Sequence, residues 1–494
     1  MTPICKTRLS SLIAISVSLI TSGCAVGPNF KRPAAPNVSG YTPAPPATTN
    51  SSPNVSGGEA QAFAEGRDIP GDWWTLFHSK SLNDLIERSL KNNPDLKSAQ
   101  AALSVAREDV LAQRGAYYPS VTGGFSATRA KSSSNVSPVT NTSALNYSFY
   151  TPEVSVSFVP DVFGLNRRTV ESLKAQDQQA RFALAATHIT LSSNVAAAAI
   201  LEASLRGQID ATRELIKINT DMLQVLRKQF EKGYVGRLDV AAQEAQLAQV
   251  VATLPPLLKQ LAQQRDLLAV LSGGFPNNDL PEKFDLASLE LPQELPVSLP
   301  SQLVEQRPDV RQAEENLHSA SAQIGIAVAN RLPNFMLTAD AGSTAVLLAH
   351  LFTGGTGFWD IGASVTQPIF EGGTLLHRER AAQAAYTEAS EQYRSTVLTA
   401  FQNVADTLHA LRQDADALNA AATARDAAKV TLDLTARQMR VGYVNYLALL
   451  SAEQSYQQSL INLVQAQSNR YSDTVALFQA LGGGWWNRPE IPRN

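Results

Sequence analysis

Residues 168–232 and 376–441 both space their apolar side chains in alternating steps of three and four, which predicts long helices with a coiled-coil seam. A helix of about 65 residues extends about 100 Å at 1.5 Å per residue, several times the length of an ordinary globular helix. The chain is therefore expected to build an elongated structure. The seam of the second stretch consists of Val397, Phe401, Val404, Leu408, Leu411, Ala415, Leu418 and Ala422.

Each long stretch ends at a motif that occurs twice. Residues 233–238 read GYVGRL and residues 442–447 read GYVNYL. A period of about 210 residues is far longer than that of a solenoid and indicates a duplicated half-molecule. Each chain turn should lead into a return helix, over 238–271 and 447–481, and Pro255 with Pro256 is expected to break the first of these.

Four segments between the helices alternate polar and apolar residues and are predicted strands: 121–130, 147–159, 334–344 and 357–367. Strands of about ten residues can cross a bilayer, and one apolar face is typical of a transmembrane barrel. A small soluble sheet packed on a helix remains the alternative. Membrane-spanning strands must close into a barrel, and known barrels start at about eight strands, so four per chain would require an oligomer.

The N-terminus has the layout of an export signal. Lys6 and Arg8 precede an apolar run over 9–20, and a small-residue stretch leads to Cys24. Residues 1–23 are the predicted signal peptide, with lipidation of Cys24 or an ordinary signal with a leftover cysteine as alternatives. The Pro- and Ser-rich residues 24–70 are expected to run extended and to bury no core.

Composition excludes several functional classes. Lys and Arg total 41 against 44 Asp and Glu, so no basic excess indicates nucleic-acid binding. Two cysteines and six scattered histidines predict neither a disulfide scaffold nor a metal site. Glu314, Glu315 and His318 are interpreted as a solvated helix face, and Arg167 with Arg168 as a solvated or lumen-facing pair. No nucleophile has a base beside it, so we expect no enzyme, no metal and no cofactor.

Together these features resemble the outer-membrane factor family, the TolC- and OprM-like channels, and within it the NodT-like lipoprotein branch. The resemblance covers essentially the whole chain and is carried by CAVGPNFKRP at 24–33, Trp73-Trp74, Asn93-Pro94 and NYLALLSA at 445–452. It implies a mixed α+β membrane protein. Three duplicated chains would each give four strands to a 12-stranded transmembrane β-barrel, continued by a long α-helical coiled-coil tunnel across the periplasm.

The resemblance also implies an organisation and a location. Cys24 would carry acyl chains, palmitate among them, and hold the protein on outer-membrane lipid while it extends into the periplasm. The expected division is a signal peptide (1–23), an anchored extended segment (24–70), a first repeat (71–274), an equatorial connector (275–300), a second repeat (301–484) and a C-terminal tail (485–494).

By the same resemblance the function is a passive exit duct for drugs or other small substrates. Its partners would be two further copies of the chain, a periplasmic adaptor (membrane fusion) protein and an inner-membrane pump of the RND type, with no nucleic acid. Type I protein secretion uses the same architecture and stays open. A lipid-anchored coiled-coil scaffold without a pore is the alternative from another class, although it gives no reason for the strands.

The two repeated turns are the candidate gate at the periplasmic tip. By resemblance its residues are Gly233, Arg237, Asp239, Gly442, Tyr443, Leu447 and Ser451. A ring of Leu447 side chains could exclude water by dewetting. Ser451 stands where relatives often have Asp, so we expect closure to depend on Leu447 and on Asp239 paired with Arg237 or another cation. The alternative is that these are ordinary residues of a coiled-coil seam, where leucine is common.

Overall fold

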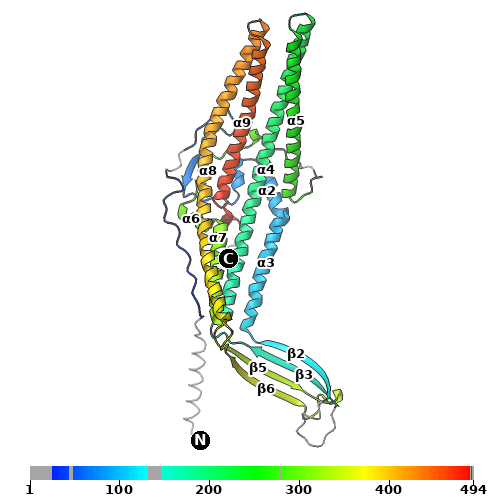
Figure 1. The fold of residues 1–494 in the computed structure, drawn as a ribbon, viewed down its shortest axis with the longest axis vertical. Helices are drawn as coiled ribbons and strands as arrows, with labels where there is room; N and C mark the ends of the chain where they lie inside the picture. Colours follow the sequence, from blue (N-terminus) through cyan, green and yellow to red (C-terminus); the bar gives the residue numbers. More distant parts are fainter. Residues whose placement is uncertain (1–24, 44–47, 132–145, 279, 490, 492–494) are drawn as a thin grey trace. The chain divides into compact units, whose positions relative to one another are not determined.

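A computed structural model describes residues 25–43, 48–131, 146–278, 280–489 and 491, in two compact units (Figure 1). The first unit comprises Met1–Pro33, Ser104–Gln179 and Ala313–Tyr393, and the second comprises Ala34–Leu103, Ala180–Gln312 and Arg394–Asn494. The predicted signal peptide and Cys24 lie outside the described residues, as does most of the connection between the first two predicted strands.

The first unit contains one antiparallel four-stranded sheet of order β2-β3-β5-β6. Its strands are β2 (Ser120–Lys131), β3 (Asn146–Phe158), β5 (Asn334–Ser343) and β6 (Gly357–Thr366). The four predicted strands are therefore confirmed, each within a residue or two of its expected ends. Among the described residues β2 and β6 pair on one side only, so both edges of the sheet remain open.

The register places apolar residues on one face of this sheet. Val154 lies opposite Ala341, Ala341 opposite Trp359, and Ala339 opposite Ile361. Trp359 and Ile361 are 75% and 77% exposed in the single chain. Side chains alternate along a strand, so the other face carries a polar middle formed by Ser155, Ser157, Thr338, Asp340 and Asp360, with Phe149, Met336 and Phe358 nearer the strand ends.

Helices adjoin the sheet in the first unit, and an N-terminal strap, residues 25–32, packs on two of them. The helical parts are the end of α3 (Pro94–Arg114), the start of α4 (Leu165–Glu231), most of α7 (Pro308–Ala329) and the start of α8 (Thr374–Arg440). The side chain of Arg168 donates to the carbonyls of Val26 and Gly27 at 2.9 and 3.1 Å. The interpretation of Arg168 as a solvated or lumen-facing residue is therefore wrong: it is 3% exposed because the strap covers it.

His318 joins the strap to both helices. Its ring stacks on Phe30 with centroids 4.3 Å apart, and its nitrogens lie 3.2 Å from carboxylate oxygens of Glu315 and Glu171. Glu314, 4% exposed, pairs with Arg32 at 3.0 Å. The expected solvated face at 314–318 is therefore wrong, because the helix pattern alone does not reveal that the strap lies over it.

The second unit contains two helical hairpins, made by the rest of α4 with α5 (Arg237–Leu271) and the rest of α8 with α9 (Tyr446–Ala480). α4 and α8 have 67 residues each, and α5 and α9 have 35 each. The predicted long helices and return helices are thus confirmed. Equal lengths in the two halves agree with duplication of one ancestral unit.

The expected break at Pro255 and Pro256 is wrong, because α5 continues through both residues. A proline inside a helix removes a hydrogen bond to the carbonyl four residues earlier. Here those carbonyls belong to Val251 and Ala252, which are exposed, as are both prolines, so water can satisfy the freed acceptors. Val250 and Gln264 are buried on either side of the pair and keep the helix packed.

Several short elements complete the second unit. They include β1 (Ala62–Glu65), which pairs in parallel with β4 (Glu294–Val297), together with α2 (Lys80–Asn92) and α6 (Pro300–Gln306). The expectation that 24–70 buries nothing is wrong at Gln61 and Ile69, which are fully buried. One described helix, α4, is long and apolar enough to cross a membrane, but 67% of its apolar window is buried inside the protein, as in a core helix.

Candidate gate at the hairpin turns

Both long helices of the second unit end in the same backbone motif. In the first hairpin the amide of Gly233 donates to the carbonyl of Phe230, and that of Tyr234 donates to Gln229. These are the two bonds of a Schellman cap, which needs a left-handed residue, and Gly233 supplies it with φ 74°. The carbonyls at the helix end are thereby satisfied within the turn.

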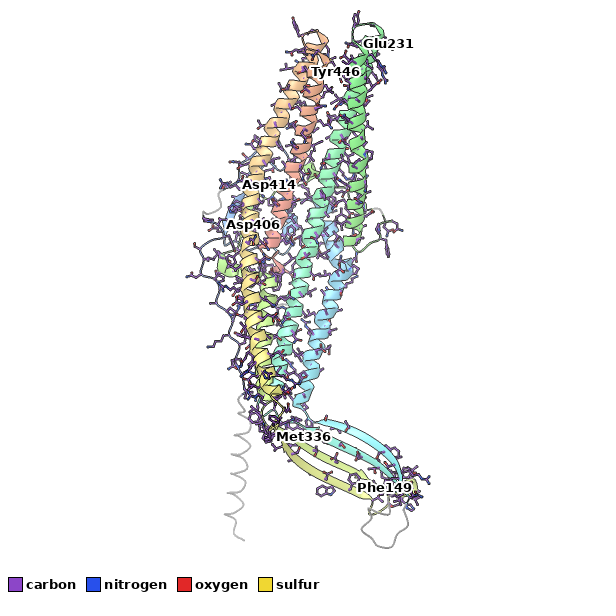
Figure 2. The ribbon with its side chains drawn as sticks, viewed as in Figure 1. Phe149, Glu231, Met336, Asp406, Asp414 and Tyr446 are labelled. Carbon is purple, nitrogen blue, oxygen red and sulfur yellow. The ribbon has the colours of Figure 1, made fainter. Side chains whose placement is uncertain are left out.

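The second hairpin repeats this cap. Gly442, at φ 79°, donates to Met439, and Tyr443 donates to Gln438. A Cβ at either glycine would meet no atom within 4 Å, so the left-handed backbone, and not space, is what requires glycine there. Figure 2 labels Glu231, the last residue of α4, and Tyr446, the first of α9, beside the two turns.

The return helices begin differently in the two hairpins. In the first, the carboxylate of Asp239 accepts from the amide of Gly236 at 3.1 Å. In the second, the Asn445 side chain accepts from the amide of Ala448 at 3.0 Å. Each is one half of a capping box. Asp239 therefore acts within its own chain as a capping residue.

The arginines near the first turn contact a carboxylate other than that of Asp239. Arg227 donates to Glu244 at 2.9 Å, and Arg237 approaches the same carboxylate at 3.9 Å. The hydrogen bond from Arg227 holds the pKa of Glu244 below its usual range. Among the described residues no ion pair joins Asp239 to Arg237, so the expected pairing does not form within one chain.

The remaining gate candidates lie on the second turn and the first turns of α9. Tyr443 and Leu447 are 83% and 63% exposed, and Ser451 is also exposed. Leu238, the counterpart of Leu447 in the first hairpin, is 80% exposed. The single chain thus presents one large apolar side chain just after each turn.

A series of hydrogen bonds between buried polar side chains lies near the turns, and the sequence did not predict it. The hydroxyl of Tyr446 donates to the side-chain oxygen of Gln243, whose nitrogen donates to the backbone and side-chain oxygens of Asn219, both at 3.0 Å. Leu223, Leu226 and Val240 pack around this series of side chains. It ties α9 to α4 and α5. The only sequence signal was a polar residue at positions where the heptad expects an apolar one.

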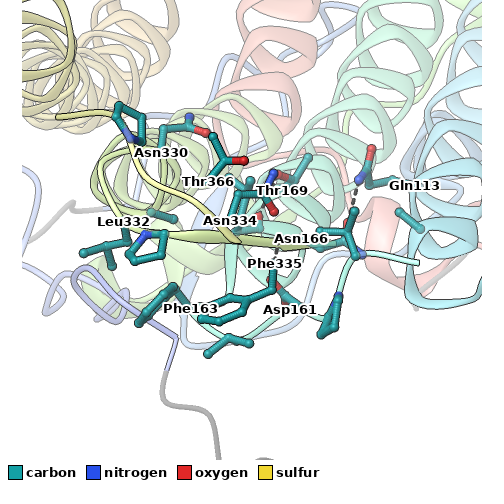
Figure 3. A pocket seen from close by; sticks show the side chains of 18 residues that line it. Gln113, Asp161, Phe163, Asn166, Thr169, Asn330, Leu332, Asn334, Phe335 and Thr366 are labelled. Atoms are coloured by element: carbon teal, nitrogen blue, oxygen red, sulfur yellow. Dashed lines mark hydrogen bonds between the residues drawn. The ribbon is translucent and has the colours of Figure 1, made fainter. Parts of the chain in front are cut away.

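A cavity of about 520 Å³ lies in the first unit where strands meet helices (Figure 3). Asp161 is the one charged residue of its lining, and its carboxylate accepts from the amides of Asn166 and Arg167, both at 2.9 Å, at the start of α4. Phe163 and Phe335 pack together beside it with centroids 6.3 Å apart. The carboxylate thus serves as a helix cap.

The architecture is that of an outer-membrane channel protein. The profile of the family described as outer membrane efflux protein matches residues 85–274 and 299–483, once in each half. The chain belongs to this family. It is 31% identical to the toluene efflux pump outer membrane protein TtgF of Pseudomonas putida, over 97% of this chain and 98% of that one.

Two further similarities agree with this family membership. The antibiotic efflux pump outer membrane protein ArpC of Pseudomonas putida is 29% identical over 97% of this chain and 96% of its own length. The solved structure of the outer-membrane channel OprN superposes with a TM-score of 0.84 at 26% identity, covering 94% of this chain and all of that one. The protein is thus an outer-membrane efflux channel component, located in the bacterial outer membrane.

Proposed function

We propose that three copies of the chain pool their sheets into one barrel of twelve strands, continued by a helical tunnel through the periplasm. The observation that carries this proposal is the four-stranded sheet with two open edges and one exposed apolar face. In lipid an open strand edge leaves backbone groups unsatisfied, and a four-stranded sheet cannot close on itself. β2 of one copy would pair with β6 of the next.

The duct would conduct passively and would have no catalytic role. Its partners would be a periplasmic adaptor protein and an inner-membrane pump of the RND type. The names of relatives refer to toluene, to antibiotics and to cations, which supports drugs or other small substrates. Passage of polypeptides, as in type I secretion, is the other outcome that a transport assay would distinguish.

Cys24 is the proposed lipid anchor. The strap that follows it is fixed to the first unit, since the amide of Val26 donates to the carbonyl of Phe163 at 3.1 Å. Gly27 also comes so close to α7 that an added Cβ would lie 2.4 Å from the Cα of Gly325. An acyl chain on Cys24 would therefore hold the folded protein at the membrane through a short, docked segment.

The proposed gate consists of the two turns from each of three chains. Leu447, with Tyr443 beside it, would supply the apolar constriction, and Arg237 with Asp239 would supply polar contacts between chains. Gly233 and Gly442 shape the turns, and Ser451 would leave the tunnel wall there without a carboxylate. The exposure of Leu447 in the single chain supports this role, because an apolar side chain in this place gains from being covered.

The mass of the protein in detergent tests the assembly. We expect purified protein to sediment as a trimer with strand content retained. A stable monomer with an intact strand signal would contradict the proposal. Uptake of antibiotics and release of a secreted polypeptide, measured in a strain that lacks its own channel, would distinguish efflux from secretion.

A further inference from the structure

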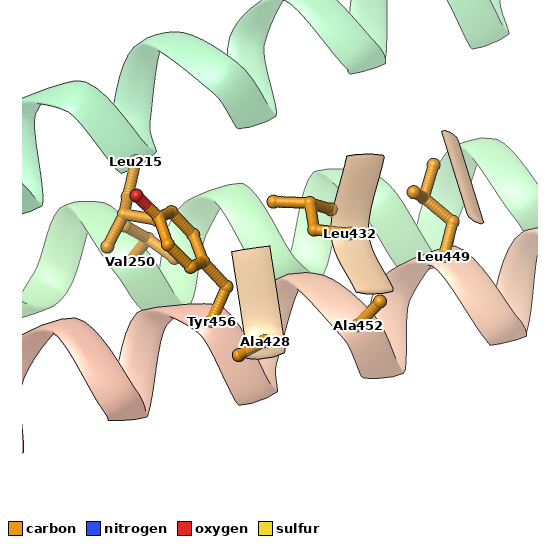
Figure 4. Close-up of a cluster of buried hydrophobic side chains, with 7 residues drawn as sticks. All are labelled: Leu215, Val250, Ala428, Leu432, Leu449, Ala452 and Tyr456. Atoms are coloured by element: carbon orange, nitrogen blue, oxygen red, sulfur yellow. The ribbon is translucent and has the colours of Figure 1, made fainter. Parts of the chain in front are cut away.

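Glu453 on α9 carries a buried carboxyl group without a partner. The residue is 2% exposed, and neither carboxyl oxygen has a hydrogen-bond partner. It lies on the same helical stripe as Leu449 and Tyr456, which belong to a compact apolar cluster with residues of the neighbouring helices (Figure 4). The cluster consists of Leu215, Val250, Ala428, Leu432, Leu449, Ala452 and Tyr456. An ionised carboxylate is strongly disfavoured in such surroundings.

The duplicated half provides an internal comparison. Glu244 occupies the corresponding position in the first hairpin, where Arg227 and Arg237 both face its carboxylate. The residues that correspond to these two arginines in the second hairpin are Ala436 and Tyr446. The first hairpin therefore has a carboxylate, Glu244, that is paired with arginines. The second hairpin has a carboxyl group, Glu453, without arginines at the corresponding positions.

Within the described residues no cation on a neighbouring element donates to the Glu453 carboxyl group in place of these arginines. Each helix around Glu453 carries charged or titratable groups at this level, and within the described residues none forms a hydrogen bond with its carboxyl group. They are Tyr446 and Tyr456 on α9, Arg237, Asp239 and Glu244 on α5, Lys217, Asp221 and Arg227 on α4, and Lys429, Asp433 and Arg437 on α8. Burial raises the pKa of the Glu453 carboxyl to about 7. Burial, with Glu453 and Asp239 nearby, also raises the pKa of Tyr446, so that its hydroxyl remains a donor.

We propose that Glu453 is a proton-controlled switch of the second hairpin. With the carboxyl group neutral, α9 packs tightly against α4, α5 and α8. Loss of the proton to solvent leaves a buried charge that must be hydrated, so this end of α9 loosens and Tyr446 and Leu447 are released from their closed positions. The link to channel opening rests on the proposed function, whereas the loosening does not.

Limited proteolysis tests the loosening without any channel assay. Arg440 ends α8 beside the second turn, and trypsin cleavage there can be normalised to a free peptide at each pH. We expect the normalised rate to rise about tenfold between pH 6 and pH 8, as the ionised fraction of a group with a pKa near 7 does. Glu453→Gln should keep the slow rate throughout, and Glu244→Gln, the matched control, should keep the wild-type rise. A rise that persists in Glu453→Gln, or in Glu453→Leu if the amide variant misfolds, overturns the switch.

Conductance in planar bilayers then tests the link to the gate. The open probability of the wild type should increase between pH 6 and pH 8, and that of Glu453→Gln should not. Channels with equal open probability at both pH values in the wild type would overturn the gating role. If no variant forms channels at any pH, the proposed function fails, and the cleavage profile alone still decides for or against the switch.

Discussion

A lysine placed on either face of the sheet distinguishes a membrane-spanning strand from a soluble one. Ile361 is the fifth of the ten residues of β6 and lies on the apolar face, opposite Ala339. Thr338 is the fifth of the ten residues of β5 and lies on the polar face, opposite Gly362. The two positions are thus matched in depth and differ in the face they present.

The expected cost of Ile361→Lys follows from that position. A lysine facing lipid at the middle of a bilayer costs about 2 to 4 kcal/mol, so three copies would lose about 6 to 12 kcal/mol per assembled trimer. Thr338→Lys would face water inside the barrel and should cost little by comparison.

The assay is folding into lipid vesicles, followed by urea titration and by resistance of the trimer to SDS. Ile361→Lys should lower the urea midpoint strongly and reduce the yield of trimer, and Thr338→Lys should resemble the wild type. Equal effects of the two lysines would refute the assignment of the apolar face to lipid. A larger effect of Thr338→Lys would instead assign the polar face of the sheet to lipid.

Three other outcomes are expected. Gly442→Ala should destabilise the second turn by about 1 to 2 kcal/mol, the cost of a left-handed alanine, with Gly442→Asn less affected, as measured by thermal unfolding. The hydrogen bond to Glu315, and then that to Glu171, raises the His318 pKa above 6.5. The contribution of His318 to strap docking is therefore fully present below pH 6.5 and is lost as pH rises through the raised value, so trypsin cleavage at Lys31 should become faster. Cys24→Ser should abolish labelling by radioactive palmitate, and labelling that persists would contradict the anchor.

The helices and strands could be predicted because their signals are local. The heptad steps of 376–441 and the alternation around Val154 each follow from the period of one element. The effect of Pro255 could not be predicted, because it depends on whether the freed carbonyls reach water. β4 was also missed, since its partner β1 lies more than 200 residues earlier in the chain.

The site was only partly accessible to sequence reasoning. The repeated glycines were found because the sequence GYV occurs at the end of both heptad stretches, and the left-handed caps explain why glycine stands there. The roles of Arg168 and Glu453 depend on what covers them, a strap in one place and three helices in the other, and no periodicity encodes that. Comparison of the two halves would have shown that Glu453 lacks the arginines of Glu244, since Ala436 and Tyr446 can be read directly from the sequence.

Single-channel conductance of the purified trimer reports directly on an outer-membrane exit duct with a gate at the turns. The wild type should conduct poorly or intermittently, and Leu447→Ser combined with Asp239→Ala should conduct continuously and admit large antibiotics into cells. Asp239→Ala alone removes a helix cap worth about 1 kcal/mol, so correct assembly of the double variant must be verified by its mass. A correctly assembled double variant with wild-type conductance would contradict the gate, and a trimer that never conducts in any variant would contradict the duct itself.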